Sequence, residues 1–290
     1  MDRPRRAARL TPGSPTGLMP DLTEAELERD LAFSVRAARD AGRRILRLRA
    51  SGRWSDPAIL GDVADQAADG FLQGLIRGCY PEDGLLSEET VDTPGRLERD
   101  RAWIVDPLDG TKEFGQGRED WAVHVALTLR GRCVLGAVAL PALDQVLFGV
   151  AVPGRERAGV EGVARPARGD GPAPQALRIA VSRSHTPPWI ESFAAQLGGA
   201  ELRPWGSAGF KVSRLLVGEA DLYVHKAGLK EWDTCAPEAV ARALGWHVSK
   251  LRGEEHRYNQ PDPRNHELVI CRPAQRERVL AAIEASGALD

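Results

Sequence analysis

Two carboxylates in a short turn-forming block are the sharpest chemical feature of this sequence. Asp106 and Asp109 lie in Asp-Pro-Leu-Asp-Gly-Thr, which directly follows the apolar run Trp103–Val105. Hard divalent cations such as Mg²⁺ prefer oxygen ligands of this kind. Gly110 allows backbone N–H groups to approach an anion closely. Asp, Pro, Gly and Thr are also common turn formers, so the block alone fits a plain turn equally well.

Further carboxylates lie where expected strands end or expected helices begin. They are Glu88 and Glu89 after a short strand, Asp62, Asp65 and Asp69 at a helix start, and Glu231 and Asp233 between a strand and a helix. Each has an ordinary structural explanation: Asp233 is expected as a helix N-cap, and Asp65 as a first-turn acid that favours the helix dipole. Turns alone would not require so many acids at the ends of strands and helices. These acids form a site only if the fold brings them together.

The elements that must position these acids follow from periodicity and capping. Thr23 and Glu26 form a capping box, and apolar residues recur at helical spacing from Leu27 to Leu46. A second helix is expected over 64–77. Closely spaced strands then predict an antiparallel meander, over 84–89, 102–106, 121–129, 133–140 and 145–152. The last third alternates in an α/β pattern, with strands at 177–181, 221–225 and 267–271 and helices at 188–197, 210–218, 234–244 and 273–285.

We therefore expect a disordered tail over 1–20, an α+β half over 21–155 with most of the metal ligands, a loop at 156–176, and an α/β half over 177–290 that completes the site. The 39 Lys and Arg balance 41 Asp and Glu, which argues against a nucleic-acid polymer as partner. No long apolar run is present to span a membrane. Four scattered cysteines without a C-x-x-C pair predict free thiols in a reducing cytoplasm.

Three motifs resemble the inositol monophosphatase superfamily of Mg²⁺-dependent, lithium-sensitive phosphomonoesterases: Leu86–Glu89, Trp103–Phe114 and Glu231–Asp233. The resemblance implies the layered α/β/α/β/α sandwich of the inositol monophosphatase and fructose-1,6-bisphosphatase type. Lys112-Glu113-Phe114 and the segment Arg257–Gln260 are more similar to the 3′(2′),5′-bisphosphate nucleotidase branch, the CysQ proteins of bacteria, in its actinobacterial form.

The resemblance also implies roles for individual residues. Two or three Mg²⁺ ions would be ligated by Glu88, Asp106, the Leu108 carbonyl, Asp109 and Asp233. Asp65 and Thr111, together with Glu88, would carry the catalytic chemistry, and Gly110 and Thr111 would hold phosphate oxygens through backbone N–H groups. The family has Thr where this chain has Asp62. Asp62 is therefore the alternative to Asp65 for the base role.

Substrate contacts are expected from the second half. Gly206 and Ser207 precede a helix, and Lys211 lies in its first turn, where N–H groups meet anions; a plain glycine-rich helix start is the alternative. His225, Lys226, Lys230 and Arg257 are candidates for a second phosphate, and Trp232 and Tyr258 for an apolar wall. His124 alternates along a strand and is expected to pack rather than to catalyse.

The expected function is hydrolysis of the 3′-phosphate of adenosine 3′,5′-bisphosphate, a small phosphorylated nucleotide, to give AMP. The sulfated relative would be a second substrate, and the enzyme would clear a by-product of sulfate assimilation. One alternative is inositol-1-phosphatase or fructose-1,6-bisphosphatase activity, and another is an inactive protein that binds phosphorylated ligands. The sequence leaves the oligomeric state open, with a homodimer as one option.

Overall fold

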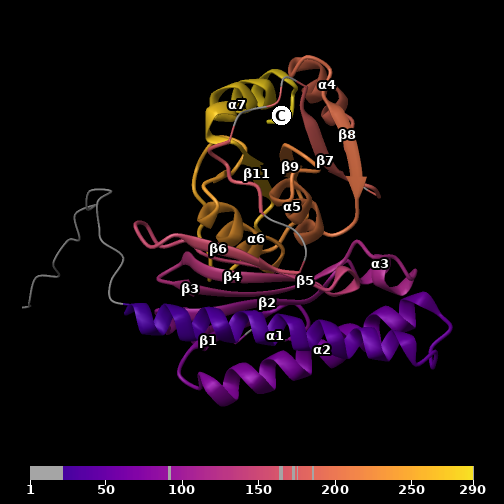
Figure 1. The fold of residues 1–290 in the computed structure, drawn as a ribbon, viewed down its shortest axis with the longest axis vertical. Helices are drawn as coiled ribbons and strands as arrows, with labels where there is room; N and C mark the ends of the chain where they lie inside the picture. Colours follow the sequence, from indigo (N-terminus) through magenta and orange to yellow (C-terminus); the bar gives the residue numbers. More distant parts are fainter. Residues whose placement is uncertain are drawn as a thin grey trace, which may run out of the picture.

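Helical and sheet layers alternate in the computed structural model, which describes residues 22–90, 93–162, 166–171, 174, 176–184 and 186–289. Helices α1 (Glu24–Ala50) and α2 (Pro57–Cys79) form one outer layer against a six-stranded sheet (Figure 1). Helices α5 (Ala208–Leu216) and α6 (Glu231–Ala243) separate this sheet from a five-stranded one, and α4 (Trp189–Gln196) and α7 (Arg276–Ala285) cover its far side. The layered α/β/α/β/α prediction is confirmed. The tail over 1–20 lies outside the described residues.

The first sheet is the predicted meander with one parallel strand at its edge. Its order is β1 (Gly84–Ser87), β2 (Arg101–Asp109), β3 (Ala122–Leu129), β4 (Arg132–Leu140), β5 (Gln145–Val150) and β6 (Arg157–Glu161). Only the β1–β2 pair is parallel. Strand β6 corrects the expectation of a loop over 156–176, because its residues pair with β5 at the edge of the sheet. Helices on both faces bury the central strands almost completely.

The second sheet has the order β10 (His247–Ser249), β11 (Glu267–Cys271), β9 (Leu222–Lys226), β7 (Arg178–Ser182) and β8 (Glu201–Trp205). Strands β7, β8 and β9 are parallel, whereas β10 and β11 are antiparallel to their neighbours. The sequence analysis missed β8 and β10. Both are edge strands, and β8 is polar and contains Pro204, so neither shows the apolar pattern of a central strand.

Helix α2 begins earlier than expected, at Pro57 rather than at Ala64. Asp56 is its N-cap, since the Asp56 carboxylate accepts the Ala58 and Ile59 N–H groups at 2.8 and 3.2 Å. Proline is favoured at the first helical position, so Asp56-Pro57 was the start signal that the analysis overlooked. The acids Asp62, Asp65 and Asp69 therefore lie inside the helix rather than in its first turn.

The N-terminus of α6 also differs from the expectation that Asp233 is its N-cap. The helix begins at Glu231, so Asp233 is its third residue. The Asp233 carboxylate accepts the Lys230 N–H at 2.6 Å, which is the N3 half of a capping box. By contrast, the box that begins α1 is the predicted one, with Thr23 and Glu26 bonding each other's backbone N–H groups.

Helix α3 (Thr111–Gly115) and three short helical turns complete the described elements. The turn η1 (Pro94–Glu98) links β1 to β2, and η2 (Pro141–Leu143) links β4 to β5. A third turn, η3 (Pro273–Gln275), precedes α7, so the helix expected over 273–285 is a turn and a helix in series.

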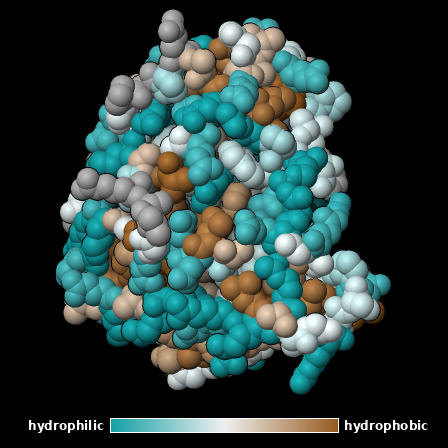
Figure 2. Space-filling model, turned by 45° about the vertical axis from the view of Figure 1, so that its right-hand side comes forward, coloured by the Kyte–Doolittle hydropathy of each residue, from teal (hydrophilic) through white to brown (hydrophobic). Residues whose placement is uncertain are grey.

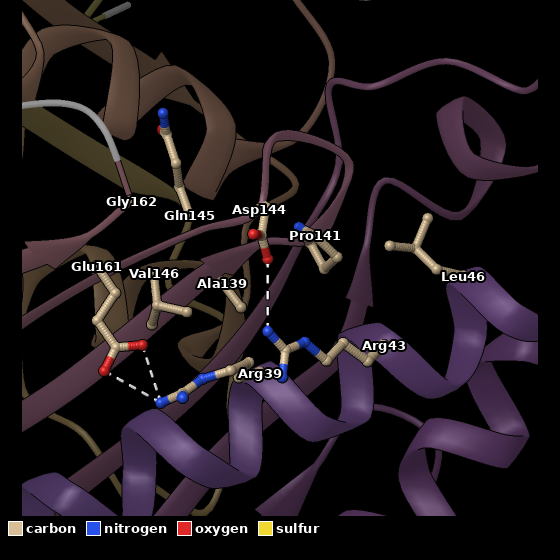
Figure 3. A pocket seen from close by; sticks show the side chains of 10 residues that line it. All are labelled: Arg39, Arg43, Leu46, Ala139, Pro141, Asp144, Gln145, Val146, Glu161 and Gly162. Carbon is tan, nitrogen blue, oxygen red and sulfur yellow. Dashed lines mark hydrogen bonds and ion pairs between the residues drawn. The ribbon is translucent and has the colours of Figure 1, made fainter.

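Two arginines of α1 pair with acids of β6 and of the turn before β5. Arg39 binds Glu161 at 2.9 Å and Arg43 lies 3.6 Å from Asp144, across a cavity of about 170 Å³ (Figure 3). The face in Figure 2 is mostly hydrophilic with scattered hydrophobic residues. Among the described residues, no helix has both the length and the apolar character needed to cross a membrane.

Candidate metal centre

Asp106 and Asp109 lie at the end of β2, where its pairing with β3 shifts register between these two residues. The shift places both carboxylates on the side of the sheet that faces the second half. Asp106 is fully buried, and its Oδ1 accepts the Leu108 N–H at 3.0 Å. Its Oδ2 is buried without a hydrogen-bond donor. A buried carboxylate oxygen with no donor is costly unless something positive binds it.

Asp109 binds the start of helix α5. Its two oxygens accept the N–H groups of Ala208 and Gly209 at 3.1 and 2.7 Å, where the helix dipole favours negative charge. Each carboxylate oxygen has a second lone pair, so these bonds leave Asp109 able to ligate a cation. The Asp109 side chain thus joins β2 of the first half to α5 of the second.

Asp65 and Thr111 meet beside this pair. Thr111 Oγ1 lies 3.1 Å from Asp65 Oδ2 and also 3.1 Å from the Leu108 carbonyl oxygen, so its single proton serves one acceptor at a time. The other Asp65 oxygen is buried without a donor. Burial, and next the negative charge of Glu89, raise the pKa of Asp65 to about 8. Asp62 makes no such contact: it is exposed and lines a separate cavity beside Lys112.

Glu88 and Asp233 complete the cluster from two further elements. Glu88 follows β1 and is exposed as a residue, but partial desolvation of its carboxyl together with the charges of Asp65 and Asp109 raises its pKa to about 8. Burial and the charge of Asp109 raise the pKa of Asp233 well above its usual range. The pKa of Asp106 is raised in the same way, by burial and then by Glu88.

Asp69 positions the segment that carries Glu88. Its carboxylate accepts the Ser87 hydroxyl at 2.5 Å and the Thr90 hydroxyl at 2.9 Å, which ties the end of β1 to helix α2. The sequence analysis grouped Asp69 with the other acids of the helix and gave it no role. Its spacing of one turn from Asp65 was the available signal, because residues i and i+4 share a helix face.

The donor set fits a hard divalent cation. The ligand atoms expected from the sequence are carboxylate and carbonyl oxygens, which Mg²⁺ prefers, and a ring nitrogen of His124 lies near two of them. Two buried carboxylate oxygens have no donor, and the acids raise one another's pKa values because like charges oppose joint ionisation. Ligand atoms of Asp106, Asp109 and His124 lie within 4.8 Å of one another.

His124 is a fully buried packing residue that also links the halves. Its Nδ1 lies 3.0 Å from the Trp232 carbonyl oxygen, which can only accept, so Nδ1 carries the proton. Its Nε2 faces Asp109 Oδ2 at 3.3 Å. The ring leaves no room at position 209: a Cβ there would lie 2.0 Å from Nε2, so only glycine fits at the start of α5.

A cavity of about 280 Å³ opens beside the carboxylates. The predicted substrate residues around it are Gly110, Thr111, Gly206, Ser207, Lys211 and His225, with the acids Asp109 and Asp233. Gly110 has φ of 95°, and a Cβ at this position would lie 3.1 Å from the Ser207 Cβ. The structure therefore brings the expected phosphate-binding residues of both halves together.

Asp120 holds the Gly206–Ser207 segment in place. Its Oδ2 accepts the Gly206 N–H at 2.7 Å and pairs with Arg183 at 2.6 Å, and its carbonyl accepts the Ser207 N–H at 3.2 Å. The sequence analysis did not identify this residue, since Arg-Glu-Asp in a loop resembles an exposed charged turn.

Of the expected substrate contacts, Lys211 borders the cavity and several others do not. Lys211 is buried, donates to the Gly206 carbonyl, and lies 5.4 Å over the Tyr223 ring, so it shapes the cavity wall; burial lowers its pKa to about 8. Tyr258 is fully buried with its hydroxyl 2.7 Å from Glu238, so the prediction of an apolar wall there is wrong. Trp232 is half-buried against the core of the second half.

The cationic residues expected to bind a second phosphate lie in different places. Arg257 is exposed and does not line the cavity; the adjacent Tyr258 N–H donates to the Gly131 carbonyl at the β3–β4 turn. Lys230 does not line the cavity either, and Lys226 lines a neighbouring cavity of about 240 Å³. Of these candidates, His225 alone among the described residues borders both cavities.

Comparisons with known proteins agree with this arrangement. The model of the inositol monophosphatase family matches residues 27–288. The chain is 39% identical over 254 residues to the 3′-phosphoadenosine 5′-phosphate phosphatase of Mycobacterium tuberculosis (84% of this chain, 89% of that protein). It is 32% identical to the 3′(2′),5′-bisphosphate nucleotidase CysQ of Escherichia coli K12 (75% and 89%).

Solved structures show the same fold. CysQ from Bacteroides thetaiotaomicron aligns with a TM-score of 0.71 at 30% identity, over 84% of this chain and 97% of that one. Inositol monophosphatase II from Staphylococcus aureus aligns with a TM-score of 0.73 at 22% identity, over 89% and 97%.

The raised pKa values predict the pH dependence of stability without metal. A carboxyl whose pKa rises on folding contributes stability below its unfolded pKa and loses it as pH rises through the folded value. For Asp65 this window runs from 3.8 to about 8. In chelator, the free energy of unfolding should fall from pH 5 to pH 8. Asp65→Asn should flatten this slope in urea titrations at each pH, and the exposed Asp62→Asn should not. If the free energy of unfolding falls with pH equally steeply in the wild type and in both variants, Asp65 is not the group with the raised pKa.

Proposed function

Because this chain belongs to the inositol monophosphatase family, we propose that it is a metal-dependent phosphomonoesterase that hydrolyses the 3′-phosphate of adenosine 3′,5′-bisphosphate and of its sulfated relative. The observation that carries the proposal is a cluster of carboxylates from the end of β1, from β2, from α2 and from α6 that raise one another's pKa values. Two of them, Asp109 and Asp233, border the cavity that Gly110 and Ser207 also line. The names of the mycobacterial and enterobacterial relatives support the nucleotide as substrate.

We assign the metal ligands to Glu88, Asp106, the Leu108 carbonyl, Asp109 and Asp233, which would hold two or three Mg²⁺ ions. When bound, Mg²⁺ supplies Lewis-acid stabilisation of the phosphoryl oxygens and lowers the pKa of the attacking water. The buried Asp106 oxygen without a donor and the raised pKa values of these acids support this set. Four carboxylates this close need compensating positive charge.

The proton of the attacking water passes to the Asp65–Thr111 pair in this mechanism. Thr111 Oγ1 lies 3.1 Å from Asp65 Oδ2, so the hydroxyl can take up a proton while it donates its own to the carboxylate. Asp65 can accept this proton because bound cations beside it would keep its carboxylate ionised. The bond between phosphorus and the ribose 3′ oxygen breaks, which leaves AMP and inorganic phosphate.

Substrate preference is set away from the reacting phosphate. The neighbouring cavity of about 240 Å³ shares Ser182 and His225 with the phosphate cavity. Its walls include Val181, Trp189 and Ile190, which suit a flat base, and Lys226, which suits a second phosphate. An inositol monophosphate offers neither group. The alternative of an inactive binding protein is disfavoured because no predicted ligand is missing from the cluster.

Asp106→Asn should abolish turnover while the fold survives. The change removes a charged ligand and relieves repulsion from Glu88, so the metal-free protein should be as stable as wild type or more stable. Phosphate release and thermal unfolding in chelator measure the two effects. Asp144→Asn, at an exposed aspartate in the turn before β5, is the matched control and should keep normal activity. Near-normal Mg²⁺-dependent activity in Asp106→Asn would refute the ligand assignment.

Asp65→Asn should lower kcat by about two to four orders of magnitude, the usual effect of a lost general base. Asp62→Asn should lower kcat much less, because Asp62 lies outside the contact with Thr111. KM should change little in both variants, since neither acid is assigned to substrate binding. A larger loss of kcat in Asp62→Asn than in Asp65→Asn would mean that Asp62, and not Asp65, is the base.

The kcat/KM of the wild type should be highest for adenosine 3′,5′-bisphosphate, followed by fructose 1,6-bisphosphate or inositol 1-phosphate. A base and a second phosphate each add roughly 1–3 kcal/mol to transition-state binding. Lys226→Ala should lower kcat/KM for the nucleotide more than for inositol 1-phosphate. The exposed Arg257→Ala should change neither, which reverses the role expected from sequence. A higher kcat/KM on inositol 1-phosphate would rule out the nucleotidase function.

A further inference from the structure

A buried carboxylate at the start of α6 binds the backbone of a distant segment. Glu231 is 1% exposed, and its two oxygens accept the N–H groups of Asn259 and Gln260 at 2.6 and 2.8 Å. Two consecutive N–H groups converge on one anion in this way because Asn259 has a left-handed conformation, with φ of 56°. Asparagine is among the few side chains that tolerate this region.

A buried arginine holds the same segment from the other side. Arg96, in η1, is 2% exposed, and its guanidinium donates to the Asn259 Oδ1 and to the Gln260 carbonyl, each at 2.7 Å. The Asn259 side-chain amide returns a hydrogen bond to the Arg96 carbonyl at 3.0 Å. We call Arg96, Asn259, Gln260 and Glu231 the 259–260 clamp. Its donors bind a buried anion and its acceptors bind a buried cation, which are the strong forms of hydrogen bond.

The clamp joins the two elements that carry opposite parts of the metal centre. Turn η1 follows the segment of Glu88 and packs on β1, where a Cβ at Gly84 would lie 3.0 Å from the Arg96 Cβ. Glu231 precedes Asp233 in the first turn of α6. Asn265 adds bonds to this region from the second half, to the Leu229 carbonyl and to Thr234, and His124 adds one from β3, to the Trp232 carbonyl.

We propose that the 259–260 clamp sets the position of Asp233 relative to Glu88, so that Arg96 and Asn259 are positioning residues for the metal centre. The inference rests on the ligand roles of Glu88 and Asp233 in the proposed function. In this inference the Arg257–Gln260 motif positions a metal ligand, whereas the sequence predicted that it contacts the substrate. Arg257 itself is exposed, and the two residues that end the motif act through the first turn of α6.

The test is direct binding of Mg²⁺ to the substrate-free protein, measured by isothermal titration calorimetry. Arg96→Ala and Asn259→Gly should each raise the Kd for Mg²⁺ about 10–100-fold, as loss of a residue that orients metal ligands does. Glycine keeps the left-handed conformation, so Asn259→Gly removes the side-chain contacts alone. Arg96→Lys keeps the charge but loses the two-pronged geometry, and it should restore part of the affinity.

The matched control is Arg101→Ala, at the other end of β2. Arg101 also forms partly buried ion pairs, with Asp30 and Asp83 at 2.9 and 3.1 Å, so its loss should lower Tm without changing the Kd for Mg²⁺. In steady state at saturating Mg²⁺, the clamp variants should lose kcat and keep KM for the nucleotide.

The outcomes distinguish the clamp from the proposed function. If Arg96→Ala, Arg96→Lys and Asn259→Gly lower Tm but bind Mg²⁺ as wild type does, the clamp is purely structural and the inference is overturned. In that case Asp233→Asn should still abolish Mg²⁺ binding, and the proposed function stands. If wild type itself binds no Mg²⁺, both the function and the inference are overturned. If Arg96→Ala does not fold, the other two variants decide.

Discussion

The constraint on which this structure depends is the mutual repulsion of carboxylates that the fold forces together. Asp106 and Asp109 lie on β2 and Asp233 lies on α6, and burial raises the pKa of Asp106 and of Asp233. Backbone N–H groups hold each in place: Leu108 for Asp106, the start of α5 for Asp109, and Lys230 for Asp233. These donors fix the orientation of each carboxylate without neutralising it. The remaining charge is the charge that the proposed divalent cations would neutralise.

The same contacts join the two halves of the molecule. Asp109 reaches from β2 to α5, Asp120 holds Gly206, and His124 bonds the carbonyl that precedes Asp233. The metal centre is therefore also the junction between the first sheet and the second half. Anything that moves α6 relative to β1 changes the distances between ligands. Cation binding and the arrangement of the halves are consequently coupled, since a cation adds attraction at the point where the halves meet.

Chemistry and specificity occupy different parts of the site. The carboxylates and the Asp65–Thr111 pair act on any phosphomonoester, so they cannot distinguish a nucleotide from an inositol phosphate. In the proposed function, discrimination would depend on the neighbouring cavity that His225 also borders, where Trp189 and Ile190 offer an apolar wall.

The sequence by itself determined the local features: the capping box of α1, the meander, and the acids at the ends of β1 and β2. Capping and periodicity depend on residues a few positions apart, which sequence shows directly. Only the tertiary structure placed Lys211 and Tyr258 in buried positions and left Arg257 outside the cavity. It also brought Asp69, Asp120 and Arg96 into hydrogen-bonding contact with partners from other elements of the fold. Such contacts have no fixed spacing along the chain, because the packing of layers and not the local backbone brings their partners together.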